Sequence, residues 1–252
     1  MTLYLISLGI QDKEDMSMKA YKTATKCSVL YLETYTSKGP TLKELQTFLK
    51  KKILPLERKD IEEQSDMLLK HAKKKTIGIL IYGHALAATT HLGLLEECRR
   101  TKTPYEIIHG SSILTAVSVT GLSLYNFGKT TSIPFKHEHV EEPYNVLQKN
   151  LKNNYHTLFL LDLANNKYMD TREAITYLLR VEHQRNEHVL DANTFAIICG
   201  GLGSKHQVIK AGTLQQLQKK PLGVYPQVLI IPGTMHFVEE DYVKGFQDTR
   251  KG

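Results

Sequence analysis

Short apolar runs alternate along the first half of the chain with segments in which apolar residues recur at helical spacing. The first pattern is typical of buried strands and the second of amphipathic helices. This alternation predicts a mostly parallel sheet with helices over both of its faces. The expected strands are 3–9, 28–34, 76–83 and 105–110, and the expected helices are 15–27, 41–51 (with Thr41 as N-cap), 64–74, 89–101 and one that begins within 111–122.

A second series of the same patterns begins near residue 112. Strands are expected at 129–135, 156–163, 194–204 and 227–233. A helix is expected at 170–184, with Asp170 as N-cap and Glu173 completing a variant of the capping box. Because the series restarts and no linker is rich in Pro, Gly or Ser, we predict two closely packed α/β domains, 1–111 and 112–252.

One turn of the first series has an unusual composition. The stretch "GILIYGHALAATTH" (78–91) is apolar until Gly83, and small residues and two threonines follow before the next apolar segment. Turns at the carboxyl ends of strands are where α/β proteins place their ligands. We therefore predict a ligand close to the backbone of Gly83–Ala87.

The composition is that of an ordinary globular protein, with 252 residues, 41% hydrophobic and 23% charged. No apolar run approaches the roughly 20 residues that cross a membrane, and the apolar start has no basic segment or cleavage site of a signal peptide. Cys27, Cys98 and Cys199 stand far apart, which favours buried core thiols in a reducing compartment, and we expect the cytoplasm.

The net charge of +7 and the pI of about 9.1 admit two interpretations. The lysines are scattered, with short runs at 50–52 and 73–75, as on solvated helix ends; they could also form a basic face for an acidic macromolecular partner. The chain has no tryptophan and no aromatic-plus-arginine pattern for base stacking. Direct binding of nucleic acid is therefore not expected.

Three motifs suggest chemistry but are incomplete. "FGKTTS" (127–132) has Ser123 where a phosphate loop needs glycine, and "CGGLGS" (199–204) lacks the full dinucleotide fingerprint. His137 and His139 could share a metal ion, but no third ligand is evident, so no metal is expected. With no clear nucleophile, metal site or phosphate loop, the sequence favours a reaction in which a cofactor supplies the chemistry.

Eight stretches identify a resemblance to a known family. They are "LYLISLGIQDKEDMSMKA", "LETYTS", "GHALAATTH", "IHGSSILTAVSVTGLSLYNFGKTTSIPF", "HTLFLLDL", "YMDTREAITYLL", "GGLGSKHQVIKAGTL" and "LIIPGTMHFVEEDYV". Over nearly the whole chain their order resembles that of the diphthine synthases, S-adenosylmethionine-dependent enzymes of the tetrapyrrole methylase class. The resemblance implies two α/β domains with the cofactor folded in a cleft between them, and a homodimer. It also implies, as methyl acceptor, a modified histidine of translation elongation factor 2 that already carries an amino-carboxypropyl group.

The resemblance also implies a set of cofactor contacts. Most of these residues are apolar or would contact the cofactor through the backbone, which suits an adenine ring and a thioether. They are Ile10, His84, Ala87, Ser112, Ile113, Leu161, Leu202 and Gln227.

The chain departs from the family pattern at one of these positions. The family usually reads Gly-Asp-Pro where this chain has Gly83, His84 and Ala85. A neutral His84 is expected to accept one hydrogen bond from the cofactor, and a protonated one to repel it. We therefore expect cofactor binding to weaken as the pH falls from about 8 to 6, around the reference pKa of histidine.

The catalytic base and two alternative functions stay open at this stage. His84, His109 and Tyr82 are candidates for a base by location only. A methyltransferase of the same fold could use another acceptor, such as a tetrapyrrole, although "TGLSLYNFGK" argues against it. The substitution at His84 leaves a second alternative: a protein impaired in cofactor binding that binds the elongation factor without catalysis.

Overall fold

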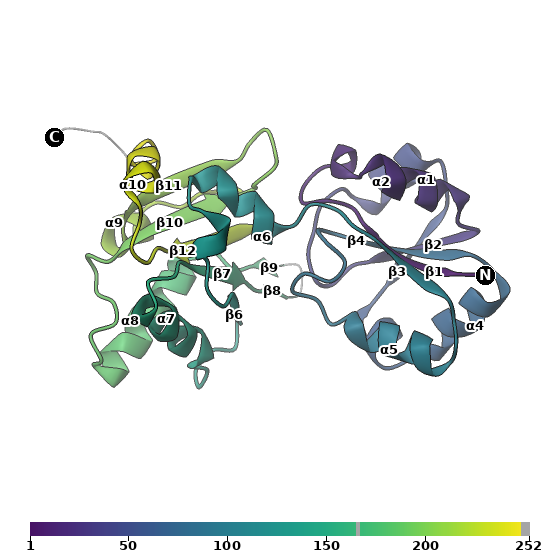
Figure 1. Ribbon diagram of the computed structural model, residues 1–252, viewed down its shortest axis with the longest axis horizontal. Helices are drawn as coiled ribbons and strands as arrows, with labels where there is room; N and C mark the ends of the chain where they lie inside the picture. Colours follow the sequence, from purple (N-terminus) through teal and green to yellow (C-terminus); the bar gives the residue numbers. More distant parts are fainter. Residues whose placement is uncertain (165–166, 248–252) are drawn as a thin grey trace. The chain divides into compact units, whose positions relative to one another are not determined.

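The computed structural model describes residues 1–164 and 167–247, and it divides into two compact units, Met1–Ala116 and Val117–Gly252 (Figure 1). Each unit has its own sheet and its own helices. The domain boundary predicted from the sequence, after residue 111, lies in the loop between the last strand of the first unit and the short helix that ends that unit.

The first unit is built on a five-stranded sheet in the order β3-β2-β4-β1-β5, and every neighbouring pair of strands is parallel. Its strands are β1 (Leu3–Ser7), β2 (Val29–Glu33), β3 (Ile53–Leu56), β4 (Ile77–Ile81) and β5 (Tyr105–Ile108). Its helices are η1 (Lys13–Asp15), α1 (Met18–Lys26), α2 (Leu42–Leu49), α3 (Arg58–Glu62), α4 (Asp66–Lys74), α5 (Leu92–Arg100) and α6 (Ile113–Ala116).

Helices cover both faces of this parallel sheet, as the sequence pattern predicts. Successive strand residues point to opposite faces, so Leu5 packs into one apolar cluster and Ile6 into another. The cluster with Leu5 includes side chains of α4 and α5, and the cluster with Ile6 includes side chains of α1 and α2. Figure 1 shows α1 and α2 on one side of the sheet and α4 and α5 on the other.

The second unit is also α/β, but its sheet is mixed. The strand order is β11-β10-β12-β7-β6, and only β6 and β7 pair in parallel among the described strands. Its strands are β6 (Thr131–Ile133), β7 (Thr157–Leu161), β10 (Phe195–Gly200), β11 (Val208–Thr213) and β12 (Gln227–Ile231), with a two-stranded ribbon of β8 (Leu163–Ala164) and β9 (Lys167–Tyr168).

The largest apolar cluster of the second unit lies between one face of this sheet and three helices. Side chains of the three helices pack with Phe159, Ile198 and Leu229 of the strands: α7 (Glu142–Lys152), α8 (Thr171–Arg185) and α9 (Leu214–Gln218). The remaining helical segments are η2 (Val117–Thr120), η3 (Leu124–Asn126) and α10 (Phe237–Lys244).

Several local predictions can be compared with the structure. Thr41 caps α2 in a capping box with Glu44, as predicted. Asp170 caps α8 by accepting hydrogen bonds from two backbone N–H groups, but the reciprocal contact from Glu173 is not part of the cap. The helix expected to begin within 111–122 is a single turn, α6, followed by the 3-10 segment η2.

The part of the chain that the structure describes also shows the state of its cysteines, its metal-ligating side chains and its apolar helices. All three cysteines are buried and unpaired. Within residues 1–164 and 167–247 no group of three or more His, Cys, Asp or Glu side chains is arranged to hold a metal ion, and the histidines at 137 and 139 belong to no such group. Among the described helices, none combines the length and the apolar character required to cross a membrane.

Candidate ligand site at the edge of the first sheet

The carboxyl ends of the parallel strands meet at one edge of the first sheet, and a glycine follows two of these strands. Gly9 follows β1 and Gly83 follows β4, and their backbones exchange hydrogen bonds of 3.3 and 2.7 Å. Both have positive φ, +88° and +72°, a conformation that favours glycine. No atom lies within 4 Å of the position that a Cβ would take at Gly83. The strand end at Gly83 is therefore free of close packing.

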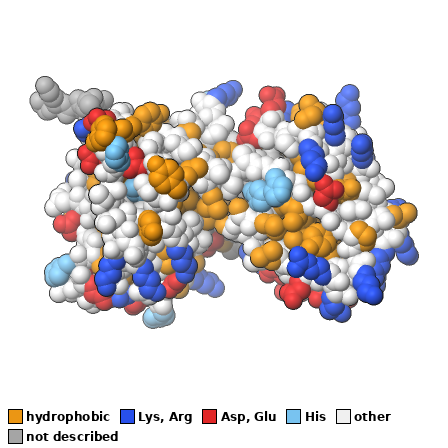
Figure 2. Space-filling view, viewed as in Figure 1, with side chains coloured by type: hydrophobic (Ala, Val, Ile, Leu, Met, Phe, Trp, Pro, Cys, Tyr) orange, Lys and Arg blue, Asp and Glu red, His pale blue; other side chains and the backbone are white. Residues whose placement is uncertain are grey.

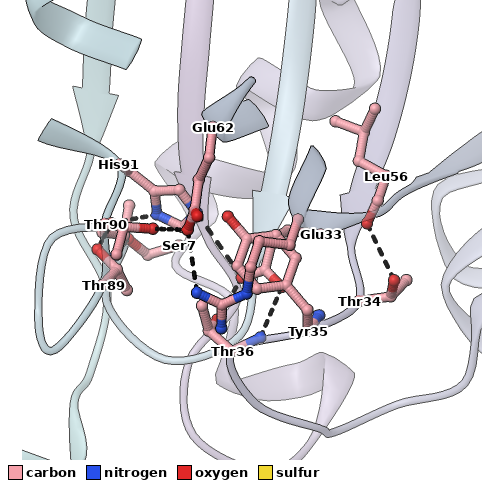
Figure 3. A network of polar contacts seen from close by, with 12 residues as sticks. Ser7, Glu33, Thr34, Tyr35, Thr36, Leu56, Glu62, Thr89, Thr90 and His91 are labelled. Atoms are coloured by element: carbon pink, nitrogen blue, oxygen red, sulfur yellow. Dashed lines mark hydrogen bonds and ion pairs between the residues drawn. The ribbon is translucent and has the colours of Figure 1, made fainter. Parts of the chain in front are cut away.

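The turn after β4 is anchored at its buried middle residue, Ala85. Its N–H donates to Ser7 Oγ at 3.0 Å. Its carbonyl oxygen accepts from Thr89 Oγ1 at 2.8 Å and from His91 Nδ1 at 2.9 Å, and Figure 3 shows these three side chains close together. Since they bind both peptide units that meet at Ala85, the backbone of the turn is held there while His84 and Ala87 remain only half-buried.

His91 connects this turn to the loop after β2. Its Nε2 lies 3.7 Å from Glu33 Oε2, and both side chains are fully buried. The other oxygen of Glu33 accepts from the backbone N–H groups of Tyr35 and Thr36, the second at 2.8 Å, and Oε2 accepts from the hydroxyl of Thr36. The Glu33 carboxylate therefore shapes one loop and faces the histidine that shapes the other (Figure 3).

A second contact between these loops runs through α3. Thr90 Oγ1 donates to Glu62 Oε1 at 2.6 Å, and Arg58 Nη1 lies 3.1 Å from the same oxygen. The Arg58 guanidinium also lies over the ring of Tyr35, 4.7 Å from its centre. Burial raises the pKa of Tyr35 to about 12, so its hydroxyl stays protonated at neutral pH.

His84, the residue that departs from the family pattern, makes two hydrogen bonds within the first unit. Its Nδ1 accepts from the backbone N–H of Leu86 at 3.1 Å, and its Nε2 lies 2.8 Å from Nδ1 of His109. Burial, together with the proximity of His109, lowers the pKa of His84. Both ring nitrogens are therefore engaged, and the expectation that neutral His84 accepts a hydrogen bond from a ligand does not fit this arrangement.

The contact between the two histidines depends on a close approach of strand ends. His109 follows β5 and His84 follows β4, with β1 between them in the sheet. A Cβ at Gly110 would lie 2.8 Å from Cβ of Ser7, so only glycine lets the chain pass this closely over the end of β1. His109 is exposed, and Figure 2 shows histidine side chains gathered at one place on the visible face of the first unit.

The other predicted contacts of the first unit lie after three of its strands, β1, β4 and β5. Ile10 is half-buried directly after Gly9, and Ala87 lies in the anchored turn. Ser112 is buried before α6, where its Oγ accepts from the N–H of Leu114 at 3.2 Å, and Ile113 begins that helix. Tyr82, a candidate base, donates its hydroxyl to the carbonyl of Pro40 at 2.7 Å.

The predicted contacts of the second unit lie on two strands and in one loop. Leu161 ends β7, Leu202 is buried in the loop after β10, and Gln227 begins β12. The side-chain amide of Gln227 is already engaged: its oxygen accepts from the N–H of Thr171 at 2.9 Å and its nitrogen donates to the carbonyl of Val224 at 3.0 Å. A ligand would therefore meet this residue through its backbone.

Two surface hollows lie away from these residues. One, of about 460 Å³, is lined by residues 63–71, and the other, of about 560 Å³, by residues 92–100. Neither is lined by a predicted contact residue.

Comparison with known proteins assigns a family to this arrangement. A family model described as Tetrapyrrole (Corrin/Porphyrin) Methylases matches residues 2–218. The chain belongs to this family. Within the family it is similar to the diphthine synthase of Methanocaldococcus jannaschii, 38% identical over 96% of this chain and 97% of that protein. It is also similar to the diphthine synthase of Methanococcus maripaludis strain C5, 37% identical over the same shares of the two chains.

A solved structure of the family agrees. A crystal structure of diphthine synthase has a TM-score of 0.91 with this chain at 32% identity, covering 98% of this chain and 96% of that one. The resemblance found in the sequence is thereby confirmed, as are the α/β fold and an enzyme class, the S-adenosylmethionine-dependent methyltransferases. The relatives also support a methyltransferase role in diphthamide biosynthesis.

The edge of the first sheet suits the methyl donor in several respects. The backbone at Gly83 is open, and Ile10 and Ala87 offer apolar surface for an adenosyl group. The polar side chains brought together there, His84 and His109, are joined to each other by a hydrogen bond of 2.8 Å. Neither carries the negative charge that the family aspartate has at position 84.

Proposed function

We propose that this chain transfers methyl groups from S-adenosylmethionine to the modified histidine of translation elongation factor 2, as a step of diphthamide biosynthesis in the cytoplasm. The observation that carries the proposal is the likeness to diphthine synthases, 36–38% identical over nearly the full length of both chains. The rigid, open turn at Gly83 supports it, because the family places its cofactor beside this turn.

The chemistry asks little of the protein beyond geometry. When bound, S-adenosylmethionine would supply an electrophilic methyl group; as the unprotonated acceptor amine bonded to that carbon, the carbon–sulfur bond would break and S-adenosylhomocysteine would leave. The protein must hold donor and acceptor at about 3 Å and exclude water. Ser7, Thr89 and His91 contribute by fixing the N–H and the C=O of Ala85, so that the backbone beside Gly83 does not yield when a ligand binds.

His84 is a poor candidate for the base that deprotonates the acceptor. Its two nitrogens are hydrogen-bonded within the chain, and taking up a proton would break one of these bonds. The acceptor amine would then lose its proton to solvent before it binds. The proposal therefore includes no side chain that acts as a general base.

The decisive experiment is methyl transfer to the protein substrate. Purified protein is incubated with methyl-labelled S-adenosylmethionine and elongation factor 2 whose histidine carries the amino-carboxypropyl group; label on that residue is the expected result. Elongation factor with the unmodified histidine is the control and should stay unlabelled. Binding of the factor without binding of S-adenosylhomocysteine, and without transfer, would instead establish the non-catalytic alternative.

Two further parts of the proposal have their own measurements. We propose a homodimer, so light scattering should give about twice 28.7 kDa, and a monomer mass would contradict it. We also propose that Leu161, Leu202 and Gln227 contact the cofactor through their backbones. Hydrogen exchange with S-adenosylhomocysteine should then show protection near these residues as well as near Ala87, and protection confined to the first unit would contradict it.

A further inference from the structure

The backbone around His84 fixes the positions of its protons. A backbone N–H can only donate, so Nδ1 of His84, 3.1 Å from the N–H of Leu86, must be the acceptor. In a neutral imidazole the other nitrogen then carries the proton. His84 is therefore protonated at Nε2, the atom that faces His109.

The same reasoning extends to the second ring. His84 Nε2–H points at His109 Nδ1 over 2.8 Å, so Nδ1 of His109 is the acceptor. His109 must therefore carry its own proton at Nε2. The chain Leu86–His84–His109 uses every ring lone pair and ends in one N–H group, on an exposed side chain.

This chain of hydrogen bonds determines what the histidine pair can bind. No acceptor remains on either ring, so an ammonium or amino group finds no partner there. A ligand oxygen can accept from His109 Nε2–H, and an anionic oxygen forms the stronger bond because charge-assisted hydrogen bonds are stronger than neutral ones.

We propose that the His84–His109 pair is a carboxylate-binding element, in which His109 donates from Nε2 and His84 is a positioning residue that fixes the tautomer of His109. The inference rests on the proposed function, which offers two carboxylates. One is on the amino-acid part of S-adenosylmethionine, and the other is on the amino-carboxypropyl group of the acceptor. Either would place a negative ligand group where a family member with aspartate has a negative side chain.

The test compares S-adenosylmethionine with its decarboxylated form, which keeps the sulfonium and the amine. Calorimetry of the wild-type protein at pH 7.5 should give binding of decarboxylated S-adenosylmethionine weaker by about tenfold, the effect of one charge-assisted hydrogen bond. In His109→Ala this ratio should fall to nearly one, and in His109→Gln, which keeps a side-chain N–H, part of it should return. His183→Ala, at an exposed histidine of α8 in the second unit, is the matched control and should keep the wild-type ratio.

The other outcomes show which of the two carboxylates His109 binds. They also distinguish a failure of this inference from a failure of the proposed function. If His109→Ala leaves the ratio unchanged but raises the KM of the modified elongation factor about tenfold, the bound carboxylate is that of the acceptor. If neither quantity changes, the inference is wrong while the proposed function stands. If wild-type protein binds neither form of the donor, the proposed function itself fails. A nitrogen-15 spectrum that shows His84 protonated at Nδ1 would overturn the inference independently.

Discussion

Each unit of this protein contains a buried pair of one histidine and one glutamate, and the two pairs hold their protons differently. In the second unit His156 Nε2 lies 3.5 Å from Glu239 Oε1, and in the first His91 Nε2 lies 3.7 Å from Glu33 Oε2. The distances are similar and all four side chains are almost fully buried. The difference lies at the other nitrogen of each ring.

In the second unit the pair is complete with a neutral histidine. The N–H of Gly233 donates to Nδ1 of His156 at 3.1 Å, so Nε2 carries the proton and directs it at the carboxylate. Burial lowers the pKa of His156, an effect that Glu239 opposes. Although burial alone would raise the pKa of Glu239, hydrogen bonds from Ser123 and His236 bring it down to about 2. A neutral ring therefore holds its Nε2–H 3.5 Å from a charged carboxylate oxygen.

In the first unit the histidine ring is arranged the other way, with its proton on Nδ1 and not on the nitrogen that faces the glutamate. Nδ1 of His91 faces the carbonyl oxygen of Ala85, which can only accept, so Nδ1 must carry a proton. A neutral His91 would then turn the lone pair of Nε2 toward the carboxylate of Glu33, and two acceptors would face each other. A proton on either of these two atoms would remove that opposition between acceptors.

In each pair a backbone group at Nδ1 fixes which nitrogen of the histidine carries a proton. The N–H of Gly233 leaves Nδ1 of His156 bare and places the proton on Nε2, facing Glu239 at the start of α10. The carbonyl of Ala85 places a proton on Nδ1 of His91, beside the turn at Gly83, and leaves Nε2 facing Glu33. The two pairs should therefore respond differently when either member is changed.

Replacing each glutamate by glutamine should have very different effects on stability. Both oxygens of Glu239 accept from a backbone N–H, of Ser123 at 2.7 Å and of His236 at 2.8 Å, so either orientation of the amide sets its NH₂ group against a donor. Glu239→Gln should lower the free energy of unfolding by about 2–4 kcal/mol, as expected when a buried network loses an acceptor. Urea denaturation followed by circular dichroism measures it.

Glu33→Gln is the matched variant in the first unit. The amide oxygen can keep the bonds from the N–H groups of Tyr35 and Thr36, and the NH₂ group can donate to Nε2 of His91. The hydroxyl of Thr36, which donates to the oxygen that this NH₂ group replaces, can rotate and accept from it instead. The expected loss is therefore less than about 1 kcal/mol. Equal losses in the two variants would show that the proton arrangements of the two pairs do not differ.

Acid should weaken the second unit in two stages. The pKa of His156 is lowered by burial, so below the ordinary value of about 6.5 the unfolded chain takes up a proton that folded His156 resists, and stability falls as the pH drops from 6.5 toward the lowered pKa. Glu239, with a pKa of about 2, stabilises the fold above its ordinary value of 4.5, and this stabilisation is lost as the pH falls from 4.5 toward 2. One such carboxylate contributes a slope of at most about 1.4 kcal/mol per pH unit.

Hydrogen exchange of the amide of Ile197, in the core of the second unit, reports this stability at pH 5, 4 and 3. In Glu239→Gln the slope of the free energy of unfolding against pH, between pH 4.5 and 2, should decrease by the contribution of the Glu239 carboxylate. An unchanged slope would mean that other carboxyl groups dominate the acid sensitivity of this unit.

The sequence predicts the first unit better than the second for a physical reason. Strands in the first unit follow one another through helices of recognisable spacing, which predicts their parallel pairing. In the second unit β10 ends at Gly200 and β11 begins at Val208. A parallel crossover needs a dozen or more residues, so this short gap permits only antiparallel pairing, a signal that the apolar pattern alone does not contain.

The elements that the apolar pattern does not predict include β3 and α7, and both have weak local signals in the sequence. The strand β3 reads Ile53-Leu54-Pro55-Leu56 beside a run of lysines, and a proline argues against a strand except at an edge, which is where β3 lies. The helix α7 begins with Pro143 at its first turn, directly after a stretch that looks like an exposed loop.

The candidate site was predictable in place but not in detail. The glycine and small residues of the turn after β4 mark the edge of the sheet, and Gly83 lies there with positive φ. The contact between His84 and His109 could not be predicted, because it depends on β1 lying between β4 and β5 in the sheet. Strand order across a sheet is a property of the whole fold, and no local spacing carries it.

The smallest expected effect is a change of proton position without a large change in stability. In protein labelled with nitrogen-15 at histidine, the shifts of His156 should show a bare Nδ1 and a protonated Nε2, because the N–H of Gly233 occupies Nδ1. His91 should show a protonated Nδ1 together with an Nε2 that carries or shares a proton with Glu33. In Glu33→Gln, the nitrogen-15 chemical shift of His91 Nε2 should become that of a nitrogen that accepts a hydrogen bond. The shifts of His156 should stay unchanged and serve as the internal control. If Nε2 of His91 is already a bare acceptor in the wild-type protein, no extra proton lies between His91 and Glu33, and the two buried pairs differ in geometry alone.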